Sequence, residues 1–154
     1  RPANALISLI VIHNISLPPN QFGGDDIEKF FQNKLDSKKH VYYQSIKDFK
    51  VSSHFLIKRS GEITQFVSCH KRSWHAGQSI WKNKKNCNDY SIGIELEGSD
   101  YVPFESLQYK KLNLLIKCLS KEYKITDVVG HSEIAPDRKT DPGPFFNWAL
   151  ILKP

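Results

Sequence analysis

The sequence lacks several features that would assign it to a specialised class of protein. It has no methionine, only three cysteines, and no apolar run close to the roughly 18 residues that a membrane-spanning helix needs. The cysteines, Cys69, Cys87 and Cys118, are odd in number and form no CxxC pair. This pattern favours a reducing compartment over a disulfide-bonded secreted domain. We therefore expect a cytoplasmic protein with no membrane partner.

Long basic tracts are also missing. Lys and Arg number 22 against 16 Asp and Glu, a formal net charge of +6, but the densest clusters, Lys82 to Lys85 and Lys110 with Lys111, are short. Nucleic-acid-binding surfaces gather their basic residues on one face, so we expect no nucleic acid partner. The positive charge can instead attract a carboxylate-rich substrate. No exposed apolar helix stripe stands out, so we expect a monomer.

The remaining composition fits one domain that spans residues 1–154. The chain is 40% hydrophobic and 25% charged, and its length falls within the range of about 100–200 residues that is usual for a single domain. It contains no internal repeat, low-complexity tract or interdomain linker.

The apolar pattern predicts an α/β fold with a central mixed sheet flanked by helices. Short runs rich in β-branched residues predict strands, and apolar residues at helical spacing predict helices. The predicted strands are Leu6 to Ile12, a hairpin of Val51 to Lys58 with Glu62 to Ser68, Ser91 to Glu97, and Thr126 to Gly130. The predicted helices are one capped by Asp25 or Asp26 that runs through Ile27, Phe30, Phe31 and Leu35, and one from Ser106 to Tyr123. Loops are predicted at Asp36 to Lys39 and at Ser132 to Pro144.

Two histidines follow predicted strands, and a carboxylate follows in the next loop. His13, His131 and Asp141 would supply two imidazoles and one carboxylate, and a catalytic zinc takes three protein ligands and leaves one position open for water. A histidine at a strand end is also often a hydrogen-bonded structural residue. The spacing leaves the ligand set open, with His54, His75, Glu133 and Asp137 as alternatives.

Further charged residues lie close to these candidates in the predicted fold. In the strand from Ser91 to Glu97, Glu95 and Glu97 share one face, because side chains two positions apart on a strand point the same way. This alternation alone cannot tell which of the two is a site carboxylate and which is solvated. Pro142 disfavours helical geometry at Asp141, so Lys139 and Asp141 are expected in an extended segment, pointing the same way.

Four segments carry a family resemblance. In chain order they are VIHNISLPPNQFGG (Val11 to Gly24), SWHAG (Ser73 to Gly77), NDYSIGIELEG (Asn88 to Gly98) and GHSEIAPDRKTDPGP (Gly130 to Pro144). They resemble N-acetylmuramoyl-L-alanine amidase family 2, and within it the cytoplasmic members that act on 1,6-anhydro-muramoyl peptides. The family is related to phage-lysozyme-type amidases and peptidoglycan recognition proteins. The resemblance covers essentially the whole chain.

The resemblance implies hydrolysis of the amide bond between (1,6-anhydro-)N-acetylmuramic acid and the L-alanine of the stem peptide, in peptidoglycan recycling. It implies that one Zn²⁺ is bound by His13, His131 and Asp141, and that Glu95 and Lys139 assist catalysis. Glu95 would take the proton of the attacking water and pass it to the leaving nitrogen. Lys139 would stabilise the oxyanion of the tetrahedral intermediate.

The resemblance also implies substrate contacts. Asn14 follows the first ligand, and Lys50 is near the cleft; similar proteins hold the sugar-peptide at these positions. The family commonly has arginine where this chain has Lys50, and again just before Cys87, where this chain has Asn86. The arginine guanidinium, which can bind a carboxylate through two hydrogen bonds, is thereby replaced by a lysine ammonium at position 50 and lost at position 86. Trp74 is either a flat wall for the sugar or peptide, or a core residue.

Two other functions are compatible with the same family. A non-catalytic peptidoglycan-binding module typically lacks one or more metal ligands, whereas all three are present here. A periplasmic or phage-like amidase that acts on intact wall would require an export signal or paired cysteines, and neither is visible. The sequence therefore favours the recycling enzyme, with a soluble 1,6-anhydro-muramoyl peptide as its partner.

Overall fold

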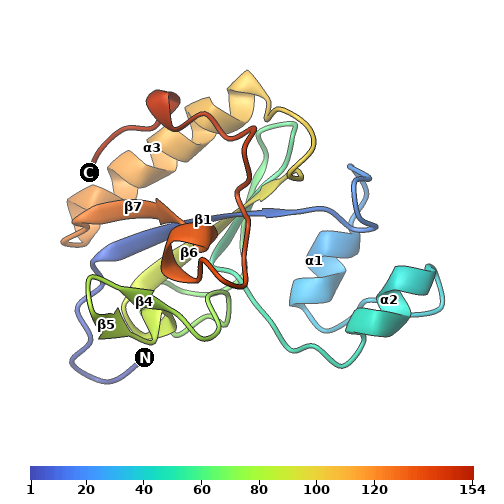
Figure 1. Cartoon of the computed structure of the whole chain (residues 1–154), viewed down its shortest axis with the longest axis horizontal. Helices are drawn as coiled ribbons and strands as arrows, with labels where there is room; N and C mark the ends of the chain where they lie inside the picture. Colours follow the sequence, from blue (N-terminus) through green and yellow to red (C-terminus); the bar gives the residue numbers. More distant parts are fainter.

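The computed structural model describes all 154 residues and is built around a five-stranded sheet with strand order β3-β2-β6-β1-β7 (Figure 1). Its strands are β1 (Leu9–Ile15), β2 (Phe55–Ile57), β3 (Ile63–Gln65), β6 (Ser91–Glu97) and β7 (Asp127–Gly130). The helices are α1 (Asp26–Phe31), α2 (Val41–Ile46), α3 (Ser106–Glu122) and α4 (His131–Ile134), with 3-10 turns η1 (Cys87–Asp89) and η2 (Trp148–Leu150). A separate hairpin consists of β4 (Ile80–Trp81) and β5 (Lys84–Lys85). The predicted α/β class with a mixed sheet is confirmed.

Strand β1 occupies a central place in the sheet. It pairs in parallel with β6 on one side and with β7 on the other, and β2 also runs parallel to β6. Only β3 is antiparallel, as the second strand of the predicted hairpin with β2. Because parallel strands end at the same edge of a sheet, the loops that follow β1, β6 and β7 meet at one rim, where ligands bind in open α/β sheets.

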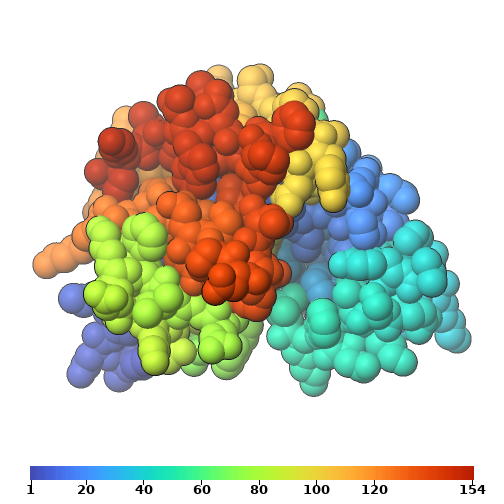
Figure 2. Space-filling view, in the orientation of Figure 1, coloured from blue at the N-terminus to red at the C-terminus, as the bar shows by residue number.

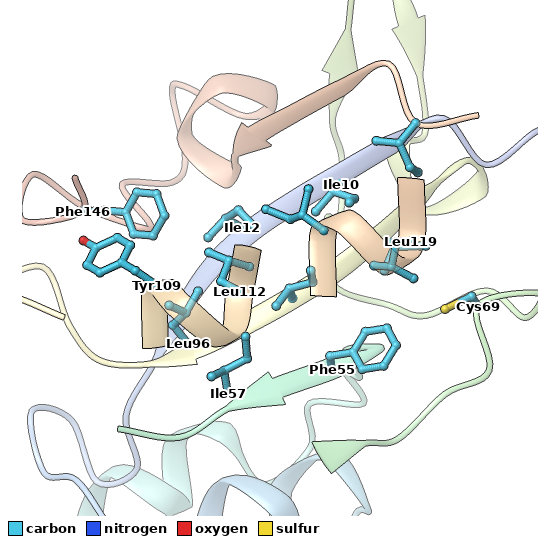
Figure 3. Packing of buried hydrophobic residues seen from close by; sticks show 14 of the residues in the cluster. Ile10, Ile12, Phe55, Ile57, Cys69, Leu96, Tyr109, Leu112, Leu119 and Phe146 are labelled. Carbon is cyan, nitrogen blue, oxygen red and sulfur yellow. The ribbon is translucent and has the colours of Figure 1, made fainter. Parts of the chain in front are cut away.

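Helix α3 covers one face of this sheet and supplies the largest core. Leu112 and Leu119 of the helix are buried against Ile10 and Ile12 of β1 (Figure 3). Ile116 belongs to the same buried cluster. The start of the helix is fixed by a capping box, in which the side chain of Gln108 accepts the backbone N–H of Glu105 at 3.0 Å. The helix predicted from Ser106 to Tyr123 is confirmed to within one residue.

The opposite face of the sheet carries a smaller core and the polar residues of the rim. Leu9 and Val11 of β1 pack there with Val129 of β7 and Ile134 of α4. Because side chains alternate along a strand, the face that begins with Leu9 and Val11 continues with His13. The buried strand therefore aims an imidazole away from α3.

Helices α1 and α2 form a lobe beside the sheet, at the right of Figure 1. The lobe is anchored by a third buried cluster that contains Leu56 of β2 together with Leu17, Ile27, Phe31, Tyr43 and Ile46. The hydroxyl of Tyr43 donates to the carboxylate of Asp26 at 3.0 Å and joins the two helices. Figure 2 shows a hollow between this lobe, in cyan and blue, and the orange central part of the molecule.

The first predicted strand had the wrong bounds. The apolar run from Leu6 to Ile12 predicts a strand that ends before His13, but β1 starts at Leu9 and continues to Ile15. Hydrogen bonding decides this, because the partner strand β6 continues past the apolar run and pairs with His13, Asn14 and Ile15.

The prediction for the first lobe helix was also too long. Helix α1 ends at Phe31, before Leu35, and the carboxylate of Asp25 accepts a hydrogen bond from Lys29 at 2.7 Å and does not cap the helix. Helix α2 was not predicted; it is one short turn-and-a-half whose start is capped by the His40 side chain, which accepts the N–H of Tyr42. The loop predicted from Ser132 to Pro144 begins within α4.

The three cysteines form no disulfide: Cys69 and Cys87 are buried and Cys118 is exposed, all as free thiols. None of the helices combines the length and apolar character that crossing a membrane requires.

Leu112→Ala should lower the free energy of unfolding by about 2–5 kcal/mol, because the fully buried side chain leaves a cavity between α3 and the sheet. Leu114→Ala, on the exposed side of the same helix, is the matched control and should change stability by less than about 0.5 kcal/mol. Urea unfolding followed by circular dichroism measures both. Equal losses in the two variants would contradict the packing of α3 described above.

Candidate metal centre and active-site cleft

Three side chains bring one ligand atom each to a common point. His13 comes from β1, His131 is the first residue of α4 directly after β7, and Asp141 lies in the following loop. His13 Nδ1 is 3.0 Å from His131 Nδ1 and 3.0 Å from Asp141 Oδ2, and His131 Nδ1 is 3.1 Å from the same oxygen. Of the residues proposed from spacing, this triplet forms the one His/Cys/Asp/Glu cluster suited to a metal ion.

Backbone contacts hold the loop of Asp141 against the sheet rim. The N–H of Ser132 in α4 donates to the carbonyl of Asp141 at 2.9 Å, and the peptide bond to Pro142 is cis. The side-chain amide of Asn14 in β1 donates to the Pro142 carbonyl at 3.1 Å. The carboxylate is thus tied to the same two elements that carry the histidines.

The donor set fits a metal ion. The ring of His131 donates from Nε2 to the Ala76 carbonyl at 3.1 Å, so in the neutral ring Nδ1 carries a lone pair toward His13 and Asp141. Acceptor atoms this close repel one another unless a cation lies among them. Their separations are a few tenths of an ångström short of the roughly 3.3 Å between adjacent ligands of a tetrahedral zinc with bonds of about 2.0–2.1 Å.

The charge states also suit metal binding. Burial lowers the pKa of His13 to about 4, although Asp141 partly opposes the shift, so the ring is neutral near pH 7. Burial alone would raise the pKa of Asp141, but the close approach of His13 and His131 outweighs it and holds that pKa well below its usual range. A neutral imidazole and an ionised carboxylate are the forms that ligate metals.

The alternative ligands are engaged elsewhere. His54 accepts the N–H of Gly93 on Nδ1 at 3.0 Å, and Glu133 accepts the N–H of Gly130 at 2.6 Å as part of a helix cap. Asp137 is exposed on the surface. His75 contacts His13 rather than the common point, with its Nδ1 2.9 Å from His13 Nε2.

The structure distinguishes the environments of Glu95 and Glu97, which the alternation of side chains along the strand could not do. Glu95 is paired in register with His13 across β6 and β1, is 8% exposed and lines the cleft. Glu97 instead accepts backbone N–H groups from Gly23 and Arg59 and holds two loops. Burial, followed by the charge of Asp141, raises the pKa of Glu95 well above its ordinary value, whereas Lys139 opposes the shift.

A cleft of about 680 Å³ opens over these residues, between the lobe of α1 and α2 and the sheet rim. His13, Asn14, Glu95, His131, Lys139 and Asp141 all line it. A side chamber of about 290 Å³ adjoins it, with Lys50, Trp74 and Arg138 in its wall. The indole of Trp74 is 55% exposed and lies 4.2 Å from the Arg72 guanidinium, so it is a wall of the cleft and not a core residue. Asn86 lines neither space.

Comparison with known proteins identifies the family of the chain. The family model described as N-acetylmuramoyl-L-alanine amidase matches residues 3–144. The chain belongs to this amidase family. The resemblance drawn from the four sequence segments is thereby confirmed.

Individual relatives agree with the family match. The chain is 52% identical over 155 residues to the 1,6-anhydro-N-acetylmuramyl-L-alanine amidase AmpD of Haemophilus influenzae, covering 99% of this chain and 84% of the relative. A crystal structure of a selenomethionine derivative of AmpD superposes with a TM-score of 0.95 at 46% identity, covering 99% of this chain and 88% of that one. The Escherichia coli amidase AmiD, in complex with anhydro-N-acetylmuramic acid-L-Ala-D-gamma-Glu-L-Lys, superposes with a TM-score of 0.68 at 34% identity. The match covers 97% of this chain and 58% of the AmiD chain.

Several lining residues of the amidase cleft were missed in the sequence. Asp100 lines the cleft and accepts a hydrogen bond from the Asn14 amide at 2.7 Å. Arg138 donates to the carbonyls of Ala76 and Gln78, both at 2.8 Å, and closes the side chamber. The rule that loops after parallel strands gather at one rim could have pointed to Asp100, three residues after β6, whereas no sequence signal distinguishes Arg138.

Glu95→Gln should stabilise the metal-free amidase at pH 7 and have little effect at pH 4. The raised pKa means that the folded state holds a proton that the unfolded state releases above about pH 4.3, so stability falls as pH rises through this range. The variant escapes this loss, and its melting temperature should exceed that of the wild type by about 2–4 °C per kcal/mol. Thermal unfolding with chelator at both pH values measures the difference.

Glu97→Gln is the control for that measurement. It weakens two backbone hydrogen bonds to a carboxylate and should lower the melting temperature at pH 7. A lower melting temperature for Glu95→Gln as well would mean that Glu95 is not a destabilised buried carboxylate.

Proposed function

We propose that this chain is a zinc-dependent amidase that cleaves the bond between (1,6-anhydro-)N-acetylmuramic acid and L-alanine in soluble cell-wall fragments, in peptidoglycan recycling. The observation that carries the proposal is the convergence of His13, His131 and Asp141 beneath a cleft that also contains Glu95. A binding module needs neither a three-ligand cluster nor a carboxylate with a raised pKa beside it.

Zinc is the metal that the donor set favours. Two imidazole nitrogens and one carboxylate oxygen, with an open side facing a cleft, are typical of catalytic zinc, which keeps one position for water or substrate. Magnesium and calcium prefer oxygen ligands. When bound, zinc would polarise the scissile carbonyl and lower the pKa of a water molecule.

The protein's own groups would then move the protons and balance the charge. Glu95, fixed on β6 beside His13, would accept the proton of the attacking water and deliver it to the nitrogen of the departing L-alanine. A raised pKa suits this exchange, because the group must both take up and release a proton near neutral pH. Lys139, at the cleft wall, would stabilise the developing oxyanion with a fixed positive charge.

Asn14, Trp74 and Lys50 would bind the substrate. The amide nitrogen of Asn14 is committed to Asp100 and Pro142, which leaves its carbonyl oxygen to accept an N–H of the sugar or peptide. Trp74 offers the ring face that Arg72 does not cover to a sugar or peptide. Lys50 lies in the side chamber, which suits a stem-peptide carboxylate.

The relatives support the choice of substrate and of process. AmpD is named for the 1,6-anhydro sugar, and AmiD was captured with an anhydro-muramoyl tripeptide. Because AmpD covers almost all of this chain, we extend its substrate class to it. We further propose a cytoplasmic, monomeric enzyme in which residues 1–154 form one amidase domain.

Metal-stripped protein titrated with zinc should regain release of L-alanyl peptide from 1,6-anhydro-muramoyl-tripeptide at one equivalent, with weak action on intact sacculi. Asp141→Ala should neither bind zinc stoichiometrically nor recover activity, because a ligand is lost. Glu95→Gln should bind zinc normally but lose about 10²–10⁴-fold in kcat. Tight zinc binding without cleavage of either substrate would instead indicate a binding module.

Lys50→Ala should raise KM for the tripeptide substrate by up to about fivefold and leave kcat unchanged, since an exposed charge contributes about 0–1 kcal/mol to binding. The effect should shrink at high salt and with a substrate whose terminal carboxylate is amidated. Lys85→Ala, an exposed lysine on β5 outside both cavities, is the control. An unchanged KM in Lys50→Ala would exclude this lysine from substrate recognition.

A further inference from the structure

His75 lies directly behind a metal ligand, but none of the roles described so far uses it. We propose that His75 is a positioning residue which, together with Ser91, fixes the tautomer of His13 so that His13 Nδ1 faces the metal. The inference rests on the proposed metal centre. It concerns the groups that prepare one ligand for zinc, not the ligand itself.

The chain of hydrogen bonds starts at a hydroxyl whose direction is unambiguous. Ser91 Oγ lies 2.6 Å from the carbonyl of Cys87, and a carbonyl can only accept, so the hydroxyl proton points there. Ser91 Oγ also lies 3.2 Å from His75 Nε2. Because its one proton is already used, the hydroxyl accepts at this contact, and His75 must carry a proton on Nε2.

The same logic passes through His75 to the ligand. A neutral ring with its proton on Nε2 has an acceptor at Nδ1, and His75 Nδ1 lies 2.9 Å from His13 Nε2. His13 therefore donates from Nε2, which leaves its Nδ1 lone pair for the metal. The Cys87 carbonyl, through Ser91 and His75, thus sets the tautomer of His13 in the way that the Ala76 carbonyl sets that of His131.

Packing holds the ring of His75 in this position. Its plane is nearly perpendicular to that of His13, with ring centroids 5.0 Å apart and 85° between the planes. On another side the ring presses against Gly93 of β6, where an added Cβ would lie only 2.4 Å from a ring carbon. A side chain at position 93 would push the imidazole away from His13, which gives a physical reason for glycine in the middle of a buried strand.

His75 has no capacity left for another role. Both of its ring nitrogens are engaged, and it is only 9% exposed. It therefore cannot act as a fourth ligand or bind substrate through a ring nitrogen without giving up one of these bonds. Positioning accounts for all of its contacts.

The test compares zinc affinity and ring protonation in matched variants. His75→Leu removes the acceptor for His13, and we expect its zinc dissociation constant, measured by competition with a chromophoric chelator, to rise about 10–100-fold. His75→Gln should recover most of that loss, because its amide can accept from His13 and donate to Ser91. ¹⁵N NMR of histidine-labelled, metal-free protein should show His13 protonated on Nε2 in the wild type and in His75→Gln.

Ser91→Ala provides an independent route if His75→Leu does not fold. It removes the acceptor that selects the tautomer of His75, so zinc should bind severalfold more weakly and His75 should lose its uniform Nε2–H signal. Ser53→Ala is the control: Ser53 is equally buried and also donates to a backbone carbonyl, that of Gly93, and its hydroxyl makes no hydrogen bond to His13 or His75. Its zinc affinity should match that of the wild type.

Three results would overturn the inference. His75→Leu or Ser91→Ala could bind zinc as tightly as the wild type, His75→Gln could bind as weakly as His75→Leu, or His13 could carry its proton on Nδ1 in the metal-free wild type. Failure of the proposed function looks different, since the wild type itself would then bind no zinc, and this inference would fall with it.

Discussion

The parallel pairing of β1 with both β6 and β7 is the constraint on which the rest of the structure depends. It sets His13 beside Glu95 in register and brings the end of β7, and therefore His131, to the same rim. One face of β1 serves both the core and the site. Leu9 and Val11 on this face belong to a core, and the next residue on it, His13, belongs to the site. The strand that carries His13 is therefore also part of the hydrophobic core, so His13 cannot shift without disturbing buried packing.

Two carboxylates in a buried site are its main electrostatic feature. Asp141 and Glu95 repel each other, and the nearby cation Lys139 lies at the wall of the cleft. A divalent cation among the three ligand atoms would balance these carboxylates, which is why the arrangement fits a metal and is costly without one. The hydrogen-bond acceptors behind the ligands are the Ala76 carbonyl behind His131 and Nδ1 of His75 behind His13. By accepting from Nε2 of each ligand ring, they leave both Nδ1 lone pairs directed toward the same point.

The lobe of α1 and α2 converts the sheet rim into a cleft. It is attached through Leu56, whose neighbour in register is Glu95, so the hydrophobic anchor of the lobe and the proposed proton carrier are adjacent on the sheet. The lobe supplies the outer wall for a substrate, whereas the proposed chemistry uses only residues of the sheet and of the loop after β7. The lobe therefore contributes to the shape of the cleft and not to the proposed chemistry.

The sequence by itself determined the fold class, the helix α3, the hairpin of β2 and β3, and, through its long motifs, the family. These features depend on local periodicity and on residues close together in the chain. The local pattern left the choice between Glu95 and Glu97 and the choice of metal ligands open, and only the family resemblance selected among them. The tertiary structure placed Trp74 at the cleft and not in the core, showed Glu97 holding two loops, and brought His13, His131 and Asp141 to one point. The reason is physical: these choices depend on hydrogen bonds and burial between residues as far as 128 positions apart, such as His13 and Asp141, and no local pattern encodes them.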